Sequence, residues 1–459
     1  MVRQVVQGQS MAAKQVKNAG KPLRWTGPPS SYFFMPGQDP GLTLLAPFDR
    51  ILTRVPGARV RQYACSEHAA IQRALKRNLE SRWTDITPAI FEIGTVPVVA
   101  HDVTFRAGTA EVGGKCLMNG ASGDRAYARY LKHNPGMPGF RRANRMFAAG
   151  RQVTQLDLPV QNPDTVKGMK FAIECRNRTN YYHFMTEALP NLVHAARLEV
   201  GKIIFHCRND DPSGFSARYI EALFPEFAGK VSFVAQQRRY DQVALAFNAR
   251  HLLYASGDPR ISHPLQDVGD DTAWRDLGGH VRRRKFAFKN SYDVSMRLLR
   301  ERVVSMMDPT AVAAAPRRIW VRRDPRNANV NQRSVIGEEL LAGRLAELEF
   351  ETVFFERLTP LEQLTLIRGA DVVVAAHGAF FANMMFARPE THFIEIGSLQ
   401  TQMHRWGDFL GNAHSAGCRY SMVFADTASE DPGQVSTIMD GLIGVRVGAR
   451  AVDLIADLV

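Results

Sequence analysis

A chain of 459 residues with 45% hydrophobic residues can bury a sizeable core, and a chain of this length normally forms two or three domains. Its formal net charge of +13 favours an anionic partner, such as a phosphate-bearing substrate or an anionic membrane surface. No apolar run is as long as a membrane span, and no zinc-finger spacing or aromatic RNA-binding strand indicates a nucleic-acid partner. We therefore expect a globular protein that does not bind nucleic acid.

The N-terminal 20 residues carry positive charge but no continuous apolar core, which predicts a mobile arm rather than a secretory signal. The cysteines have no paired spacing, so we expect reduced thiols and a cytoplasmic protein. They are Cys65, Cys116, Cys175, Cys207 and Cys418. The net charge extends this expectation to peripheral contact with anionic lipid at the inner face of the plasma membrane.

Residues 41–165 predict a mixed, partly β region, because Pro, Gly and Ser clusters flank a strand-like run at 95–105. From residue 169 the pattern becomes an alternation of strands and helices. Strands are predicted at 170–175, 201–207 and 230–235, and helices at 180–196 and 213–224. This alternation is typical of a parallel α/β unit.

A helix predicted at 291–308 leads into a second α/β unit. Its strands are predicted at 317–321, 351–355, 371–376 and 391–396, and its helices at 334–348, 359–369 and 379–387. The start of the second helix is marked most clearly: Thr359 is a predicted N-cap, Pro360 the first helical residue, and Glu362 the partner in a capping box. Gly369 is positioned to end that helix.

Two Rossmann-like sheets facing one another are the simplest architecture for this order of elements, with a partly β accessory region before them. The predicted boundaries are an N-terminal arm 1–40, an accessory region 41–165, a first Rossmann-like half 166–290, a linker helix 291–315, a second Rossmann-like half 316–430 and a C-terminal helical segment 431–459.

The segment TNYYHFMTEALPNLVH, residues 179–194, has polar residues at helical spacing. His183, Glu187 and Asn191 would lie on one face of a helix that begins at Thr179 or Asn180 and kinks at Pro190. An acid and a base four residues apart suit proton transfer. An internal His–Glu hydrogen bond that only stabilises the helix is an equal alternative.

Ligands of open α/β sheets bind at the carboxyl ends of the strands, so residues that follow strands are candidates for binding. Arg322 and Arg323 follow one predicted strand and could hold phosphate oxygens. His377, Gly378 and Ala379 follow another and precede a helix, whose free N–H groups favour a phosphate. The alternatives are ordinary surface arginines and a plain tight turn.

The segments NYYHFMTEALPNL and RGADVVVAAHGAFFANMMFARPETHFIEIG together resemble glycosyltransferase family 61, including its bacterial capsular polysaccharide members. The resemblance covers scattered blocks between about residues 170 and 398. It implies two Rossmann-like domains of the GT-B type, inversion at the sugar carbon, a nucleotide-sugar donor and no obligatory metal. We expect a UDP-linked donor and a glycan or lipid-linked glycan acceptor, with no cofactor.

The family motifs assign roles by position. His183 and Glu187 match the first motif, and one would be the catalytic base while the other orients it. Arg323 matches the strand-end arginine, with Arg322 as its rival. Donor-binding roles are implied for His377, Gly378, Ala379, Asn383 and Glu395, the last through ribose hydroxyls. Phe380 and Phe381 depart from the usual glycine and aliphatic residue, so Phe380 would narrow the donor pocket or stack on a base.

Other functions have less support. No convincing DxD metal site is present, because the acidic runs at 209–211 and 269–271 fit turns or caps better. No GxSxG elbow indicates a hydrolase, and no GxGxxG follows an early strand as in Rossmann oxidoreductases. A noncatalytic polyanion-binding or scaffold protein with a Rossmann-like core stays as the alternative.

Overall fold

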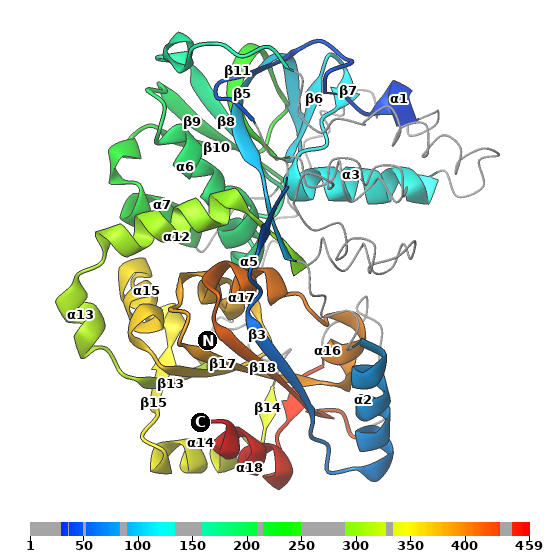
Figure 1. Cartoon of the computed structure of the whole chain (residues 1–459), viewed down its shortest axis with the longest axis vertical. Helices are drawn as coiled ribbons and strands as arrows, with labels where there is room; N and C mark the ends of the chain where they lie inside the picture. The colour runs from blue at the N-terminus through cyan, green and yellow to red at the C-terminus, as the bar shows by residue number, and fades with distance from the viewer. Residues whose placement is uncertain are drawn as a thin grey trace, which may run out of the picture.

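The computed structural model of the protein has a mixed α/β fold built around two large sheets, one in each half of the molecule (Figure 1). It describes residues 29–34, 36–48, 52–82, 90–133, 158–208, 214–248, 290–326, 334–431 and 443–459. Two sets of predictions lie outside these ranges: the N-terminal arm up to residue 28, and the acidic runs 209–211 and 269–271. Within them, no helix has both the length and the apolar character needed to cross a membrane.

The first sheet has the strand order β10-β9-β8-β11-β5-β6-β7, and β1 pairs with β5. β8, β9 and β10 are parallel, and β11 is parallel to β8 but antiparallel to β5. The strands are β1 Leu42–Leu44, β5 Thr95–Arg106, β6 Thr109–Val112, β7 Lys115–Cys116, β8 Lys170–Cys175, β9 Lys202–Cys207, β10 Val231–Val234 and β11 Arg238–Asn248. The strands predicted at 95–105, 170–175, 201–207 and 230–235 are therefore confirmed.

The second sheet has the order β14-β19-β18-β17-β16-β13-β15, and β3 pairs with β18. The run from β15 through β13, β16, β17 and β18 to β3 is parallel throughout. Its strands are β3 Arg59–Ala64, β13 Arg318–Arg322, β14 Val335–Ile336, β15 Glu351–Phe354, β16 Val372–Ala376, β17 His392–Ser398, β18 Arg419–Thr427 and β19 Val445–Arg446. β17 is buried at every position, as expected for a parallel strand covered on both faces.

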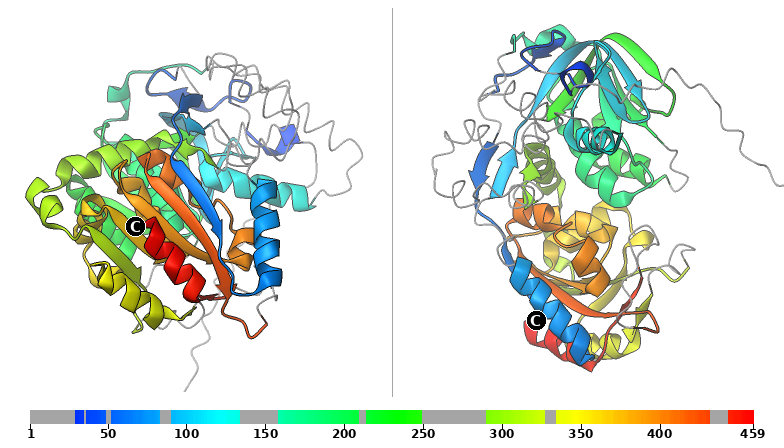
Figure 2. Two further views of the ribbon diagram at one scale, coloured as in Figure 1. Left: turned by 60° about the horizontal axis from the view of Figure 1, so that its bottom comes forward. Right: turned by 90° about the vertical axis from the view of Figure 1, so that its right-hand side faces the viewer.

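Helices cover both sheets, and a small sheet of β2 Leu52–Val55, β4 Ile90–Ile93 and β12 Tyr292–Asp293 lies beside them (Figure 2). The helices of the first half are α1 Pro29–Tyr32, α3 Gly120–His133, α5 Tyr181–His183, α6 Leu192–Ala195 and α7 Phe215–Leu223. Those of the second half and the linker are α2 Ala69–Arg82, α12 Val294–Met306, α13 Pro309–Ala314, α14 Glu338–Glu347, α15 Pro360–Gly369, α16 Leu399–His404, α17 Leu410–Ala416 and α18 Ala449–Leu458. Short 3-10 turns lie at Pro163–Val166, Pro225–Phe227, Phe355–Arg357 and Ala379–Phe386.

Local signals account for several of these elements. The predicted capping box of α15 is present, because the Thr359 hydroxyl accepts from the Glu362 N–H and the Glu362 carboxylate accepts from the Thr359 N–H. The helix predicted at 334–348 is wrong at its start. Val335 and Ile336 pair with β19, and Gly337 adopts a left-handed conformation (φ 82°), so the helix begins at Glu338.

Residues 41–165, predicted as one accessory region, are divided between the sheets. β1, β5, β6 and β7 join the first sheet, whereas β3 extends the second sheet as its edge strand beside β18. In Figure 1, β3 and α2 lie with the lower half of the molecule although they precede β5 in the chain. The second sheet is therefore completed by residues that lie more than 250 positions before β13.

An apolar core continues from one half to the other. Phe184, Met185 and Leu189 belong to the same buried cluster as Leu299 on α12 and Met384 in the turn after β16. The hydroxyl of Tyr181 donates to Asn383 Oδ1 across this boundary at 2.7 Å. The two halves are thus packed together, and the carboxyl ends of β8 and β16 open onto the same cavity.

Candidate functional site

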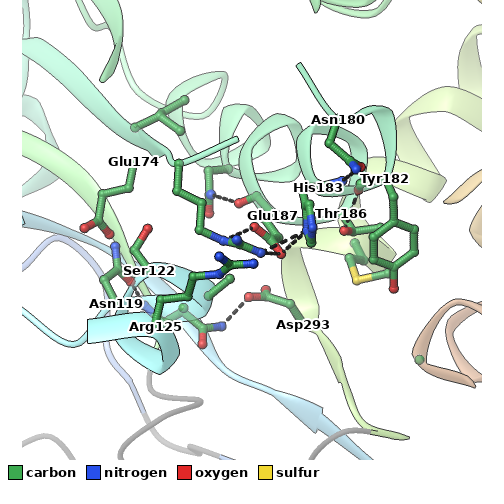
Figure 3. A pocket seen from close by; sticks show the side chains of 18 of the residues that line it. Asn119, Ser122, Arg125, Glu174, Asn180, Tyr182, His183, Thr186, Glu187 and Asp293 are labelled. Carbon is green, nitrogen blue, oxygen red and sulfur yellow. Dashed lines mark hydrogen bonds and ion pairs between the residues drawn. The ribbon is translucent and has the colours of Figure 1, made fainter. Parts of the chain in front are cut away.

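A cavity of about 420 Å³ lies where the two halves meet. The first half contributes residues at the end of β8, the helical segment from Asn180, and α3. The second half contributes His377, Gly378 and Ala379 after β16, and the loop around Asp408. Figure 3 shows Glu174, Asn119 and Ser122 on one side of this cavity and His183 and Thr186 on the other, with Glu187 between them.

The predicted helix at 180–196 is present but is wound in four parts. α5 is followed by a π-helical turn at Phe184–Ala188, a 3-10 turn at Leu189–Asn191 that contains Pro190, and α6. Asn180 is the N-cap, since its side chain accepts from the His183 N–H at 3.3 Å. A π turn within a helix often marks a functional site.

The polar stripe of this segment faces the cavity, as its spacing predicts. His183, Glu187 and Asn191 all line the cavity, while the apolar face is buried in the core. His194 does not join the stripe: it is buried, and its Nε2 lies 2.9 Å from the Ser295 hydroxyl. Burial lowers the pKa of His194 to about 4, so this histidine is a neutral core residue.

Glu187 is held by two partners. Arg176, which directly follows β8, forms two hydrogen bonds to its carboxylate, at 2.9 Å to Oε2 and 2.7 Å to Oε1. His183 Nδ1 lies 2.7 Å from the same Oε1. Arg176 Nη2 also lies 2.9 Å from Nδ1. Because an ionised carboxylate oxygen can only accept, the shorter contact to Oε1 assigns the proton to Nδ1, which donates to Glu187. The lone pair of His183 then lies on Nε2.

These contacts decide the charge of Glu187. Burial acts to raise its pKa, but the hydrogen bond and charge of His183, together with Arg176, outweigh burial and hold the pKa of Glu187 below its ordinary value. The carboxylate therefore stays ionised at neutral pH and is a weak proton acceptor. An ionised carboxylate on Nδ1 fixes the ring and favours proton uptake at Nε2, as in other acid–histidine pairs.

A second His–Glu pair joins His377, which directly follows β16, to Glu395 in the middle of β17. His377 Nδ1 bonds to Glu395 Oε1, and the Tyr420 hydroxyl donates to Glu395 Oε2. Glu395 is almost fully buried and does not line the cavity, whereas His377 does. Glu395 is thus placed to orient His377 rather than to reach a ligand directly. His377 also borders a much smaller hollow that contains Arg323 and Gly397.

The two strand-end arginines point to different partners. Arg322 forms two hydrogen bonds to Glu338, at 2.9 and 2.6 Å, and lies over the Trp320 ring. Arg323 instead donates from Nη2 to the His377 carbonyl at 2.9 Å. The structure therefore brings Arg323, and not Arg322, to His377. A Cβ on Gly378 would lie 3.4 Å from the Arg323 guanidinium, an ordinary van der Waals distance.

The remaining predicted donor residues differ in exposure. Gly378 and Ala379 line the cavity, but Asn383 is 1% exposed and accepts from Tyr181. Phe381 is fully buried and stacks on Phe409, with ring centroids 5.0 Å apart. Phe380 packs edge-on against Phe355 at 4.8 Å, and neither phenylalanine lines either cavity.

Comparison with known families identifies the activity. Residues 181–394, a little under half of the chain, match the model of the family Glycosyltransferase 61. The protein is a glycosyltransferase. The matched range includes His183 and Glu187 on one wall of the cavity and His377 on the other, together with Arg323 in the small hollow beside His377. A search of curated proteins gave no match to the chain.

Sequence reasoning missed most of the other residues that line the cavity. Among those with charged side chains, Arg125, Glu174 and Arg176 lie before the matched range, Asp293 lies within it, and Arg405 and Asp408 lie after it. Arg176 directly follows the strand predicted at 170–175. Because ligands of open α/β sheets bind at the carboxyl ends of strands, the same argument used for Arg323 would have identified Arg176 as a candidate. Arg125 on α3 carried no such signal, and its pKa is lowered by burial and by the charge of Arg176.

Metal ligands are not grouped near this site. Among the residues that the structure describes, no three His, Cys, Asp or Glu side chains are arranged to hold a metal ion. The five cysteines are all free and buried. Cys175 and Cys207 occupy paired positions on β8 and β9, which places them in the core and not in the cavity.

Proposed function

We propose that the protein is an inverting, metal-independent glycosyltransferase that moves a sugar from a nucleotide-sugar donor, UDP-linked, to a glycan or lipid-linked glycan acceptor. The observation that carries this proposal is the cavity between the halves, which has the His183–Glu187 pair on one wall and His377 on the other. The arrangement proposed is of the GT-B type, with the acceptor against the first sheet and the donor against the second.

On the acceptor side, His183 is the proposed base. Inversion requires one group to take the proton of the acceptor hydroxyl as that oxygen attacks the sugar carbon. Nε2 of His183 has no hydrogen-bond partner among the described residues, and the ionised Glu187 on Nδ1 compensates the positive charge that the ring gains. Glu187 is then a positioning residue, and Arg176 keeps it ionised.

On the donor side, charge develops on the leaving diphosphate, and donors must already be in place to stabilise it. Arg323, His377 and the N–H groups at Gly378 and Ala379 are the groups assigned to it. Arg323 and His377 are adjacent, and the turn that begins at Ala379 presents backbone donors at the strand end. Asn383 and Glu395 support this wall through Tyr181 and His377.

The proposed setting is synthesis of a bacterial surface or capsular polysaccharide, on the cytoplasmic side and in peripheral contact with the membrane. Two features support it: the resemblance of the motifs to capsular members of the family, and the net charge of +13. Lipid-linked acceptors would lie at that surface.

The test is a screen of purified protein against nucleotide-sugars and glycan acceptors, with products followed by mass spectrometry and the anomeric configuration read by NMR. We expect transfer with inversion that survives chelation by EDTA. Retention of configuration, or activity that disappears with EDTA and returns only with a divalent ion, would contradict the mechanism. Salt-sensitive binding of polyanions without any transfer would favour the noncatalytic alternative.

A further inference from the structure

Glu174 is a carboxyl group on the cavity wall that the mechanism above does not use. It is the penultimate residue of β8, and its register partner on β9 is His206. Its Oε1 accepts from the Ala110 N–H at 2.7 Å. Its Oε2 is buried yet has no hydrogen-bond partner of good geometry in the described part of the chain. A buried polar atom without a partner is costly, which suggests that a ligand completes it.

The surroundings of Glu174 favour its neutral form. Burial raises the pKa of Glu174 to about 8, although hydrogen bonds from Ala110 and the Asn119 side chain act to lower it. At pH 7 the carboxyl is mostly protonated and has an O–H to donate. Asn119 also donates to the Ala246 carbonyl, and the Ser122 hydroxyl donates to the Gly108 carbonyl, both at 2.9 Å. Figure 3 shows Glu174 directed toward these two residues, at the edge of the cavity.

We propose that Glu174 is an acceptor-binding residue that, in its neutral form, donates a hydrogen bond from its Oε2 hydroxyl to an oxygen of the acceptor sugar. This inference rests on the proposed function, because it assigns the first-half wall to the acceptor. It adds a specificity-determining residue to that wall. The consequence is that acceptor affinity falls when Glu174 ionises, since the carboxylate has no proton to donate.

The other titratable groups around Glu174 are also shifted by burial. His206 on β9 is neutral because burial lowers its pKa to about 4. Burial raises the pKa of Cys116 on β7 well above its usual value. Burial raises the pKa of Glu111 on β6 as well, although its ion pair with Arg106 acts to lower it, and burial lowers the pKa of Arg125 on α3. Glu111 is thus the second carboxyl of this cluster, and a Glu111 variant is the control for a pH effect of Glu174.

The test measures binding of simple acceptors without a donor. Wild-type protein is titrated by ligand-observed NMR with methyl glycosides of glucose, galactose, mannose, xylose and rhamnose at pH 6.5, 7.5 and 9.0. We expect the tightest-binding glycoside to bind about threefold to tenfold more weakly at pH 9.0 than at pH 6.5, the effect of one lost hydrogen bond.

Two variants separate recognition from a structural role. Glu174→Gln keeps a donor that does not ionise, so its affinity should be the same at all three pH values. Glu174→Met removes the donor and should bind weakly at every pH. Deoxy analogues of the bound glycoside, each lacking one hydroxyl, are then titrated against the Met variant. One analogue should bind this variant as tightly as the parent glycoside does, and its missing hydroxyl identifies the oxygen that Glu174 contacts. Glu111→Gln, a matched buried carboxyl outside the cavity, should keep the wild-type pH dependence.

Several outcomes would overturn the inference: no panel sugar binding the wild type, affinity that is constant with pH or rises with it, or pH dependence that persists in Glu174→Gln. If Glu174→Met does not fold, the Gln variant alone still decides. The proposed function fails separately, because absence of sugar transfer with pH-dependent binding intact would refute the transferase mechanism but not the role of Glu174.

Discussion

Two His–Glu pairs of the same composition each contribute their histidine to the cavity wall, and their environments differ. His183 and Glu187 lie four residues apart on one helical segment, with side chains 24% and 22% exposed. His377 and Glu395 come from two neighbouring strands, with side chains 10% and 5% exposed. The first pair is shared with an arginine and opens to the cavity, whereas the second is closed by Tyr420. The same two residue types therefore form a partly exposed pair in one place and a closed, buried pair in the other.

The difference lies in what else the glutamate bonds. Arg176 keeps Glu187 charged, and the His183 side chain beside it is partly exposed to the cavity. Glu395 uses both oxygens inside the protein, so His377 is held in one orientation. A rigid histidine suits binding of a diphosphate, while a base must exchange its proton.

The largest effect should come from removing the proposed base. His183→Ala removes the imidazole ring whose Nε2 is the proposed proton acceptor, so kcat should fall by about a hundredfold to ten-thousandfold. Affinity for a nucleoside diphosphate, measured by calorimetry, should stay within about twofold because that ligand is assigned to the other wall. If His377→Ala lost kcat to this degree and His183→Ala did not, the roles of the two pairs would be reversed.

Glu187→Gln should have the next largest effect. The amide keeps the shape but loses the charge that fixes His183, so we expect kcat to fall by about tenfold to a hundredfold. If Glu187 were itself the base, kcat of Glu187→Gln would fall as much as kcat of His183→Ala, or more. Measuring kcat of both variants under the same conditions therefore identifies the base.

The same variant changes stability with pH. The pKa of Glu187 is lower in the folded protein than in the unfolded chain, so its contribution to the free energy of unfolding is present above about pH 4 and is lost as the pH falls through the folded value. Thermal unfolding of wild type and Glu187→Gln between pH 3 and pH 7 should therefore differ most near neutrality. If wild type and Glu187→Gln had equal melting temperatures at every pH, the ion pair between Glu187 and Arg176 would not contribute to stability.

A matched pair of arginine variants tests the donor wall. Arg323→Ala should weaken nucleoside diphosphate binding by about tenfold to a hundredfold, the range for a charged hydrogen bond. Arg322→Ala should leave that affinity unchanged, because its guanidinium is committed to Glu338 on the far side of the strand. Equal losses in both, read by calorimetry on folded protein, would remove the assignment of the phosphates to Arg323.

Tyr420→Phe should have the smallest effect on turnover. It deletes the hydroxyl that bonds Glu395 and loosens the buried pair, so we expect a rise of a few-fold in donor KM with kcat nearly constant. The unfolding free energy should fall by about 1–3 kcal/mol, the cost of an unsatisfied buried group. A large loss of kcat with unchanged KM would instead place this pair in the chemical step.

Much of the local structure follows from the sequence alone. The polar stripe of residues 183–191, the Asn180 cap and the capping box of α15 depend on neighbours within four positions, so periodicity and residue type are enough to find them. Four strands of each sheet were also recognisable, because a buried parallel strand such as β8 or β17 is a short apolar run, whereas β11 and β18 were not predicted.

Tertiary structure alone decided which residues meet. Nothing near residues 59–64 indicates that they pair with β18 more than 350 positions later, since strand pairing depends on contacts that the chain makes only when folded. The partners of the two glutamates were hidden for the same reason: Arg176 reaches Glu187 from the end of β8, and Tyr420 reaches Glu395 from β18. Sequence spacing was enough to predict that His183 and Glu187 form a pair. How each glutamate is held depends on a third residue, Arg176 for Glu187 and Tyr420 for Glu395.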